Sequence, residues 1–599
     1  MCGITAIIDR ENQPIDEIEI QAANNMVKHR GPDASGYYFG ANFALGHRRL
    51  AVLDLSEAGN QPMTYEGLYI IFNGEVYNYL EIRRTLIENG YSFQSDTDTE
   101  VILAAYHYWG YSCVEHFNGM WAFIIYDPRK NILFCSRDRF GIKPFYYSKI
   151  GKKTCFVSEI KQFSAIKEWR ASMNRPRAYE FIVWGYHDHS GNETLFENVY
   201  QLPKGHHLIY DLDTHSFEIL CYYKVEQRDC SDISWEEAKT TFKSLFLDAV
   251  KLRIRSDVKI GSALSGGLDS SSIVGAITKH LEVSTAIQQL TTVSACFDSS
   301  VYDESFWIDK VAKKHHLLSH KVYPTASSFL NSLRTLTWHQ DEPIIGAGVF
   351  AQYKVFETAR REGITVMVDG QGADEILAGY NKFYYPFLRQ LIRSHPQRFL
   401  AEALGAFFLH RQSPGQIIRA TYKYLKKNKQ RSVPWISPQF IPAPEDLFGR
   451  SSDNTIQETS INLLYEMGIS ILLHYEDRNS MASSVESRLP FLDHRLVEFC
   501  LSLPSNYKIK GGKRKYLLRE SMKAILPSEV YNRYDKMGYA TPQSEWMKDY
   551  QEDFHHLFLN AIERADGFFS PSILETKDQA LQWRCLALGV WLEVFDVEI

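Results

Sequence analysis

The sequence predicts an α/β protein of two domains: a strand-rich first domain, and a second domain built on a doubly wound parallel sheet with a mostly helical C-terminal part. Three observations predict this class. The chain has 599 residues, too many for one hydrophobic core. Alternating apolar segments typical of strands dominate residues 2–225. From residue 234 onward, strand-like and helix-like segments alternate, as they do in parallel sheets.

Composition excludes several classes of protein. With 45% hydrophobic and 23% charged residues the chain is globular, and a net charge of −6 gives no basic surface for nucleic acid. No apolar run approaches the roughly 18 residues that span a bilayer, and the N-terminus lacks a basic-then-apolar signal. We therefore expect a cytoplasmic protein without nucleic-acid or membrane partners. The nine cysteines form no Cys-x-x-Cys pair, which argues against zinc and disulfides. The histidines at 187–189 and 206–207 are expected in loops or strand ends, without metal.

Cys2 opens the first domain. If Met1 is removed, the α-amino group of Cys2, with an ordinary pKa of about 7.7 to 8.0, can serve as the base for its own thiol. A cysteine at position 2 is by itself weak evidence for a catalytic nucleophile, because most buried cysteines are structural. The loops that follow Cys2 strengthen the case for a nucleophile.

Polar loops follow Cys2 between strand-like runs at 68–72 and 121–126. Asn73-Gly74 alone would fit a hairpin turn. Their order and spacing nevertheless resemble the N-terminal nucleophile (Ntn) αββα glutaminase domain of class II glutamine amidotransferases. The segments that carry the resemblance are Met1-Cys2-Gly3-Ile4, Arg30-Gly31-Pro32-Asp33, residues 46–50, residues 72–78 and residues 95–100.

The resemblance implies a role for each polar residue. Cys2 would attack the side-chain amide of glutamine, while Asn73 and the backbone N–H of Gly74 would form the oxyanion hole. Arg49 would bind the α-carboxylate of glutamine. Glu75 and Asp98 would hold its α-ammonium group. We expect this domain to span 2–225, with structural segments at 135–147 and 156–161, a closing hairpin at 200–223, and a linker at 226–234.

The second domain begins with a capping box, Ser234 and Glu237, that predicts a helix to about Arg253. A short strand at 259–263 and a helix from about residue 273 follow. Further strands are predicted at 290–297 and 365–368, and a helix at 306–316. This alternation places the ligand at the carboxyl ends of the strands.

The loop at 264–271 joins the first of these strands to its helix and has the chemistry of a phosphate site. Gly266 and Gly267 let the backbone turn, and the helix start presents free N–H groups to an anion. The spacing is neither of the common nucleotide loops. Ser-Gly-Gly-Leu-Asp-Ser instead resembles the pyrophosphate loop of ATP pyrophosphatases; the plain alternative is a serine-rich helix cap. The resemblance implies ATP binding by Leu264, Ser265, Gly266, Gly267, Asp269, Ser270, Ala295, Asp369, Gly370 and Gln371.

A second acidic turn, residues 369–375, follows the strand at 365–368. Parallel strands bring their carboxyl ends to one edge, so we expect Asp374 to lie near Asp269. Two carboxylates from separate loops suit a Mg²⁺ ion bridging the phosphates of ATP. The alternative is that both acids are merely solvated turn residues.

The C-terminal part is expected to be mostly helical, with polar groups at 477–493 and cations at 510–519. With the 264–271 loop, these segments resemble the synthetase domain of glutamine-dependent asparagine synthetases, here spanning 234–599. The resemblance implies that glutamine, aspartate and ATP are the substrates and that ammonia crosses the domain interface. It also implies that Lys515 stabilises charge on the phosphates and that Arg488 orients the acceptor or nucleotide.

One turn departs from the family. Asp369-Gly370-Gln371-Gly372 stands where these synthetases usually have Ser-Gly-Glu-Gly, and a glutamine cannot accept a proton. Our hypothesis is that Asp369 takes over part of that role. Alternatively, the acceptor is another carboxylate, such as a sugar uronic acid. A β-lactam synthetase-like cyclase and a non-catalytic binding protein are further alternatives. The segment 398–454 is compatible with an acceptor pocket or a subunit contact, and the sequence allows a homodimer.

Overall fold

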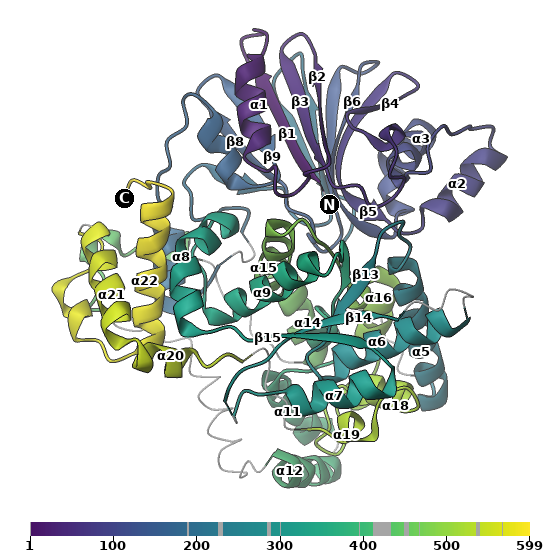
Figure 1. Ribbon diagram of the computed structural model, residues 1–599, viewed down its shortest axis with the longest axis vertical. Coiled ribbons are helices and arrows are strands. Elements are labelled where there is room, and N and C mark those ends of the chain that lie inside the picture. Colours follow the sequence, from purple (N-terminus) through teal and green to yellow (C-terminus); the bar gives the residue numbers. More distant parts are fainter. Residues whose placement is uncertain are drawn as a thin grey trace.

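The computed structural model of the protein (Figure 1) describes residues 2–187, 191–225, 232–283, 289–299, 301–394, 396–410, 433–447, 455–466, 468–534, 540–565 and 567–599. Two antiparallel sheets lie in the upper half of the view and a parallel sheet with helices lies below them. The N-terminal end of the chain lies where the two halves meet. Three predicted features fall outside the described residues: positions 226–231 of the linker, positions 411–432 and 448–454 of the segment 398–454, and His189.

Two six-stranded sheets form the N-terminal part, in the orders β10-β8-β9-β1-β3-β2 and β12-β11-β7-β6-β5-β4. Apolar side chains of β1, β3 and β9 face those of β5, β6, β7 and β11, so the core lies between the sheets. The strands are β1 Gly3–Asp9, β2 Ala34–Phe39, β3 Phe43–Arg49, β4 Met63–Tyr65, β5 Leu68–Val76, β6 Gly119–Asp127, β7 Ile132–Arg137, β8 Tyr146–Ile150, β9 Lys153–Val157, β10 Val199–Gln201, β11 His206–Asp211 and β12 Phe217–Cys221.

Helices cover the outer faces of this sandwich. α1 Glu17–Asn25 packs on β1 and β3, while α3 Asp98–Trp109 packs on β4 and β5, with α2 Tyr79–Glu88 beside it. The result is the four-layered αββα arrangement that the sequence predicted. The predicted closing hairpin is present as β11 and β12, which pair antiparallel.

The third sheet has five parallel strands in the order β15-β14-β13-β16-β17. Alternate residues of β16 face opposite sides: Val366 and Val368 join the core under α5 and α6, whereas Met367 joins the core under α9. Helices on both faces make this the predicted doubly wound sheet. Its elements are β13 Ile260–Ala263, β14 Thr291–Ala295, β15 Leu318–Val322, β16 Val366–Val368, β17 Glu486–Arg488, α5 Trp235–Arg253, α6 Leu268–Val283, α7 Ser305–Lys314, α8 Ala326–Gln340 and α9 Ala347–Arg361.

Helices make up most of the remaining residues that the structure describes, as predicted. They are α10 Ala373–Ile376, α11 Tyr384–Ser394, α12 Pro396–His410, α14 Ile456–Tyr465, α15 Ile469–Ala482, α16 His494–Ser502, α17 Ser505–Lys508, α18 Tyr516–Met522, α19 Ser528–Tyr531, α20 Gln543–Asp549, α21 Gln551–Arg564 and α22 Gln579–Val594. The last helix, α22, packs on α4 Arg175–Trp184 of the N-terminal part, so one apolar core crosses both halves of the chain.

One strand was not predicted. Glu486–Arg488 lies within the part that is expected to be mostly helical, and it forms β17, the edge strand of the parallel sheet. The segment Glu-Ser-Arg has no apolar alternation, so nothing local indicates a strand. Pairing with β16 and burial of its charged side chains against ionic partners fix its conformation instead.

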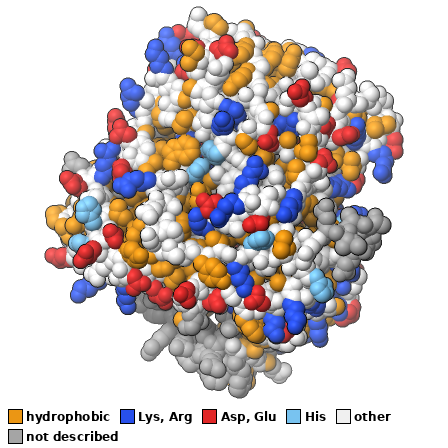
Figure 2. Space-filling view, in the orientation of Figure 1, with side chains coloured by type: hydrophobic (Ala, Val, Ile, Leu, Met, Phe, Trp, Pro, Cys, Tyr) orange, Lys and Arg blue, Asp and Glu red, His pale blue; other side chains and the backbone are white. Residues whose placement is uncertain are grey.

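The surface agrees with the balanced composition. On the face shown in Figure 2, acidic and basic side chains are interspersed rather than gathered into a field of one sign. Among the described residues, no helix has both the length and the apolar character that a membrane crossing requires.

Candidate active sites

The first candidate site surrounds Cys2, which is 8% exposed and precedes β1. Its backbone N–H donates to Oδ1 of Asn73 over 3.1 Å, and Nε of Arg30 donates to its carbonyl oxygen over 2.9 Å. Burial raises the pKa of the thiol, and an N–H from the Leu50 backbone partly offsets this. The main chain of Cys2 is therefore held from both sides while its thiol faces a pocket.

That pocket is lined by four of the five residues predicted to bind glutamine, all but Asn73. Its lining includes Cys2, Arg49, Gly74, Glu75, Asp98 and Glu486. Five of these six belong to the N-terminal sandwich, whereas Glu486 comes from β17 of the parallel sheet. The sequence does not indicate Glu486 as a pocket residue, because its place there depends on how the two halves pack.

Asn73 has the hydrogen-bonding state that an oxyanion hole needs. It is fully buried, its Oδ1 accepts from Cys2, and among the described residues its Nδ2 has no acceptor. A buried amide donor without a partner is costly unless a ligand supplies one. Gly74 beside it tolerates no side chain, because a Cβ would lie 2.2 Å from the Met120 carbonyl oxygen.

Two buried carboxyl groups, those of Glu75 and Asp98, also line the Cys2 pocket. Glu75 is 3% exposed, one of its oxygens has no hydrogen-bond partner among the described residues, and burial raises its pKa well above the usual range. Burial also raises the pKa of Asp98 to about 7, although the Val76 N–H donates to it over 2.8 Å. Two adjacent acids that are costly to ionise when the pocket is empty are suited to binding a cation.

Arg49 lies in the pocket but is already engaged. Its guanidinium donates to the carbonyl oxygens of Ser56, Leu53 and Asp54 and to the side chain of Asn60. Arg49 therefore holds the 53–60 loop over the pocket. It can bind a glutamine carboxylate only by sharing or exchanging these bonds.

The second candidate site lies at the carboxyl edge of the parallel sheet. Nζ of Lys515 contacts Oδ2 of Asp269 at 2.6 Å and Oδ1 of Asp374 at 2.7 Å, so the two predicted metal ligands converge on one cation. Both carboxylates raise the pKa of Lys515, although burial opposes them, and its ammonium stays charged. The predicted convergence of the two acidic loops is confirmed.

The loop after β13 turns at a glycine before α6, as the sequence predicts. Gly266 adopts the left-handed conformation with φ +64°, and a Cβ there would lie 2.6 Å from Cβ of Trp307. The Ser265 backbone N–H donates to Oγ of Ser270 over 3.2 Å, which closes the turn before α6. Leu264 donates to the Val293 carbonyl, and Ala295 ends β14 at the same sheet edge. Asp369, Gly370 and Gln371 follow the neighbouring β16.

The backbone of Arg488 lies beside the predicted ATP site, since its carbonyl accepts from the Asp369 N–H over 2.9 Å, but its side chain points toward the Cys2 pocket. It is fully buried; Nε donates to Glu486 over 2.6 Å, Nη1 donates to the Arg253 and Arg255 carbonyls, and Nη2 lies 3.5 Å from Glu75. These contacts set its side chain beside the Cys2 pocket and not with Asp269 or Lys515. They do not support the predicted role in orienting the acceptor or nucleotide.

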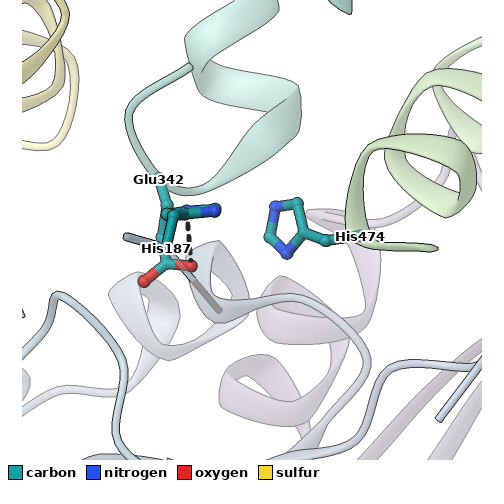
Figure 3. A group of neighbouring side chains, drawn as sticks. All are labelled: His187, Glu342 and His474. Atoms are coloured by element: carbon teal, nitrogen blue, oxygen red, sulfur yellow. Dashed lines mark ion pairs between the residues drawn. The ribbon is translucent and has the colours of Figure 1, made fainter. Parts of the chain in front are cut away.

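A buried cluster elsewhere joins the two halves. Figure 3 shows His187 and Glu342 side by side, with the ring of His474 opposite. Nε2 of His187 lies 3.0 Å from Oε2 of Glu342. Nε2 of His474 lies 2.8 Å from the Gln340 carbonyl, and Glu342 also accepts from the Leu195 N–H. Each of the three residues offers one atom that could bind a metal, and these atoms lie within 4.8 Å of one another. The contacts given above, however, explain the cluster as a structural link between the two halves.

Comparison with known proteins agrees with this architecture. A glutamine amidotransferase domain profile matches residues 1–223, and an asparagine synthase profile matches residues 241–592. The fold and the two sites define a glutamine amidotransferase joined to an ATP-dependent ligase.

Relatives match over most of the chain. Asparagine synthetase [glutamine-hydrolyzing] 3 of Bacillus subtilis is 31% identical over 94% of this chain and 92% of its own length. Putative asparagine synthetase [glutamine-hydrolyzing] 2 of Methanocaldococcus jannaschii is 38% identical over 65% and 78%. Amidase chry2 of Gibberella zeae is 28% identical over 91% and 90%. The chain belongs to the asparagine synthase family, and ATP is its co-substrate.

Proposed function

We propose that this enzyme makes asparagine by three coupled steps: hydrolysis of glutamine at Cys2, adenylation of the aspartate side-chain carboxylate by ATP, and amidation of the adenylate by the released ammonia. Asparagine, glutamate, AMP and pyrophosphate are the products. The observation that carries the proposal is that one chain holds both a cysteine pocket and the Asp269–Lys515–Asp374 cluster. We assign glutamine hydrolysis to residues 2–225. We assign adenylation and amidation to residues 234–599.

In the glutaminase half, the thiol of Cys2 would attack the amide carbon of glutamine, with the α-amino group of the mature N-terminus taking the proton. The developing oxyanion would accept from Nδ2 of Asn73, which lacks any other acceptor among the described residues, and from the Gly74 N–H. Glu75 and Asp98 would bind the α-ammonium group, and Arg49 the α-carboxylate. Ammonia leaves, and water releases glutamate from Cys2.

In the ligase half, a carboxylate oxygen of aspartate attacks the α-phosphorus of ATP, and the bond to pyrophosphate breaks. The backbone between Leu264 and Ser270, with the N-terminal end of α6, would hold the phosphates. Ala295, Asp369, Gly370 and Gln371 would border the nucleotide. The Lys515 ammonium, which stays charged, would stabilise negative charge on the phosphates.

We assign a Mg²⁺ ion to Asp269 and Asp374. Their carboxylates fit this role because both already contact one cation, the Lys515 ammonium, and carboxylate oxygens are the ligands that Mg²⁺ prefers. When bound, Mg²⁺ neutralises part of the charge on the phosphates.

The acceptor is the part of the proposal that most needs a test, because a relative named an amidase also matches along nearly the whole chain. Pyrophosphate release should be measured across a panel of carboxylates, with glutamine or ammonium as nitrogen source. We expect aspartate to give the highest rate. Stimulation by a sugar uronic acid but not by aspartate would favour the alternative acceptor, and no release with any carboxylate would refute the ligase.

We also propose a cytoplasmic location, since ATP and glutamine are cytoplasmic metabolites, and a homodimer as the assembled form. Light scattering of the purified protein would test the second point: a mass of twice 69.2 kDa is expected, and the mass of one chain would refute it.

A further inference from the structure

A buried glutamate, Glu476 of α15, lies against the turn that departs from the family. It is 2% exposed, its carboxyl group is hydrogen-bonded to that of Asp369, and Nε2 of Gln371 lies 3.5 Å from its Oε2. The same turn borders the pyrophosphate loop, because a Cβ on Gly370 would lie 3.3 Å from Cβ of Asp269. The carboxyl pair therefore adjoins the second candidate site.

The other groups facing Glu476 are neutral. Oγ of Ser487 from β17 donates to its Oε1, and Nε2 of Gln352 from α9 donates to its Oε2 over 2.5 Å. From α8, Gln340 is bonded to Asn479 instead. Nearby charges face elsewhere: Asp477 pairs with Arg30, while Glu486 pairs with Arg488, which also contacts Glu75. Among the described residues, Asp369 is thus the charged group that meets Glu476.

Two hydrogen-bonded carboxyls titrate as a unit. Both cannot ionise without repulsion, so the first proton binds to the pair more tightly than to a lone carboxylate. Burial, and then the negative charge of Asp369, raise the pKa of Glu476 well above its usual range. A base works best when its conjugate acid has a pKa near the working pH, and a lone aspartate falls far below that.

We propose that Asp369 and Glu476 act together as the proton acceptor of the amide-forming step, with Asp369 facing the reacting nitrogen and Glu476 as the positioning residue that shares the proton. The inference rests on the proposed function. The nitrogen of ammonia bonds to the acyl carbon of the adenylate, and the bond from that carbon to the phosphate oxygen breaks, its electron pair leaving with AMP. One N–H proton passes to the doubly ionised pair, which becomes singly charged. Gln371 cannot take that proton.

The test is Glu476→Gln, which keeps the shape and one accepting oxygen but removes the second carboxylate. We expect kcat of ammonia-dependent synthesis to fall at least about tenfold, a part of the 10²- to 10⁴-fold that general bases contribute. The acid limb of its pH profile should move to lower pH, because Asp369 would titrate as a single carboxyl. Glu476→Asp, which keeps the carboxyl, should keep the acid limb near that of the unchanged enzyme.

Two further readouts separate this role from a structural one. Exchange of labelled pyrophosphate into ATP with aspartate, and glutamine hydrolysis, should both persist in Glu476→Gln. An unchanged acid limb with unchanged kcat would overturn the inference, and so would a loss of exchange in proportion to synthesis. Absence of aspartate-dependent exchange in the unchanged enzyme would instead refute the proposed function.

Discussion

At the scale of single residues, buried polar atoms without a hydrogen-bond partner give the most information about ligand binding. Nδ2 of Asn73 and one oxygen of Glu75 are buried without a hydrogen-bond partner among the described residues, and both belong to residues of the Cys2 pocket or its border. Burying such groups costs free energy, about 1–3 kcal/mol each. A fold keeps them where a ligand completes the bonds, and glutamine offers the matching acceptor and donor.

Asn73→Ala should therefore lower kcat of glutamine hydrolysis by about 10²- to 10³-fold. The reason is loss of the Nδ2 donor to the oxyanion. Synthesis with ammonium in place of glutamine should continue, which provides the internal control. Equal losses with both nitrogen sources would show that the substitution disturbs the fold instead.

The affinity for glutamine should depend on pH through Asp98, whose pKa is about 7. The α-ammonium group of glutamine binds the ionised carboxylate, so protonation competes with binding. We expect the KM for glutamine to rise as the pH falls through 7, while the KM for aspartate does not follow it. Asp98→Asn should give a high KM at every pH; a variant that kept the pH-dependent rise would place the titration elsewhere.

Gly379 marks a tight place in the ligase site. A Cβ there would lie 1.8 Å from Oδ1 of Asp374 and 2.2 Å from Cε of Lys515. Gly379→Ala should displace Lys515 and lower aspartate-dependent pyrophosphate exchange by at least about tenfold, the effect of roughly 1.4 kcal/mol. Glutamine hydrolysis should remain. Unchanged exchange would indicate that Lys515 does not act on the phosphates.

At the scale of elements, the short strand β17 borders both sites. Its alternate residues face opposite ways, since Glu486 lines the Cys2 pocket while Ser487 donates to Glu476 beside Asp369. The strand β17 therefore lies between Cys2, where ammonia is formed, and the site of the adenylate. The arrangement depends on contacts between distant segments.

The elements that could be predicted from the sequence are those whose residue patterns are local. The N-cap of α5 at Ser234, the glycine turn before α6 and the alternating runs of the sandwich all lie where the sequence predicts them. The strand β17 and the role of Glu476 could not be predicted, because both depend on contacts with residues far away in the sequence. The surroundings of the Arg488 side chain could not be predicted for the same reason, because Glu75, which lies 3.5 Å from it, is on the other side of the interface between the two halves.

At the scale of the whole molecule, a buried ionic network ties the two halves together. Arg30, whose Nε donates to the Cys2 carbonyl, pairs with Asp477 of α15 at 2.8 Å and with Glu159 at 2.7 Å. The next residue, Arg478, pairs with Asp341 at 3.1 Å. The backbone of the nucleophile is thus connected to the helix that carries Glu476.

Asp477→Asn should loosen this interface. Removing one partner leaves Arg30 and Lys143 less compensated, and breaking a buried pair costs about 3–5 kcal/mol. Thermal unfolding should shift to lower temperature, and more glutamate should form per asparagine because ammonia escapes. Arg334→Gln, which breaks an exposed ion pair with Glu593, is the matched control and should change neither quantity. An unaltered product ratio in a destabilised Asp477→Asn would limit the network to stability.

The central claim is that nitrogen freed at Cys2 is consumed at the ATP site of the same molecule. The most direct measurement is the ¹⁵N content of asparagine formed from amide-¹⁵N glutamine, aspartate and ATP in the presence of unlabelled ammonium. The account predicts labelled asparagine and AMP in equal amounts, with little dilution by the ammonium. Glutamate formed without labelled asparagine, or asparagine carrying only the isotope ratio of the free ammonium pool, would contradict it.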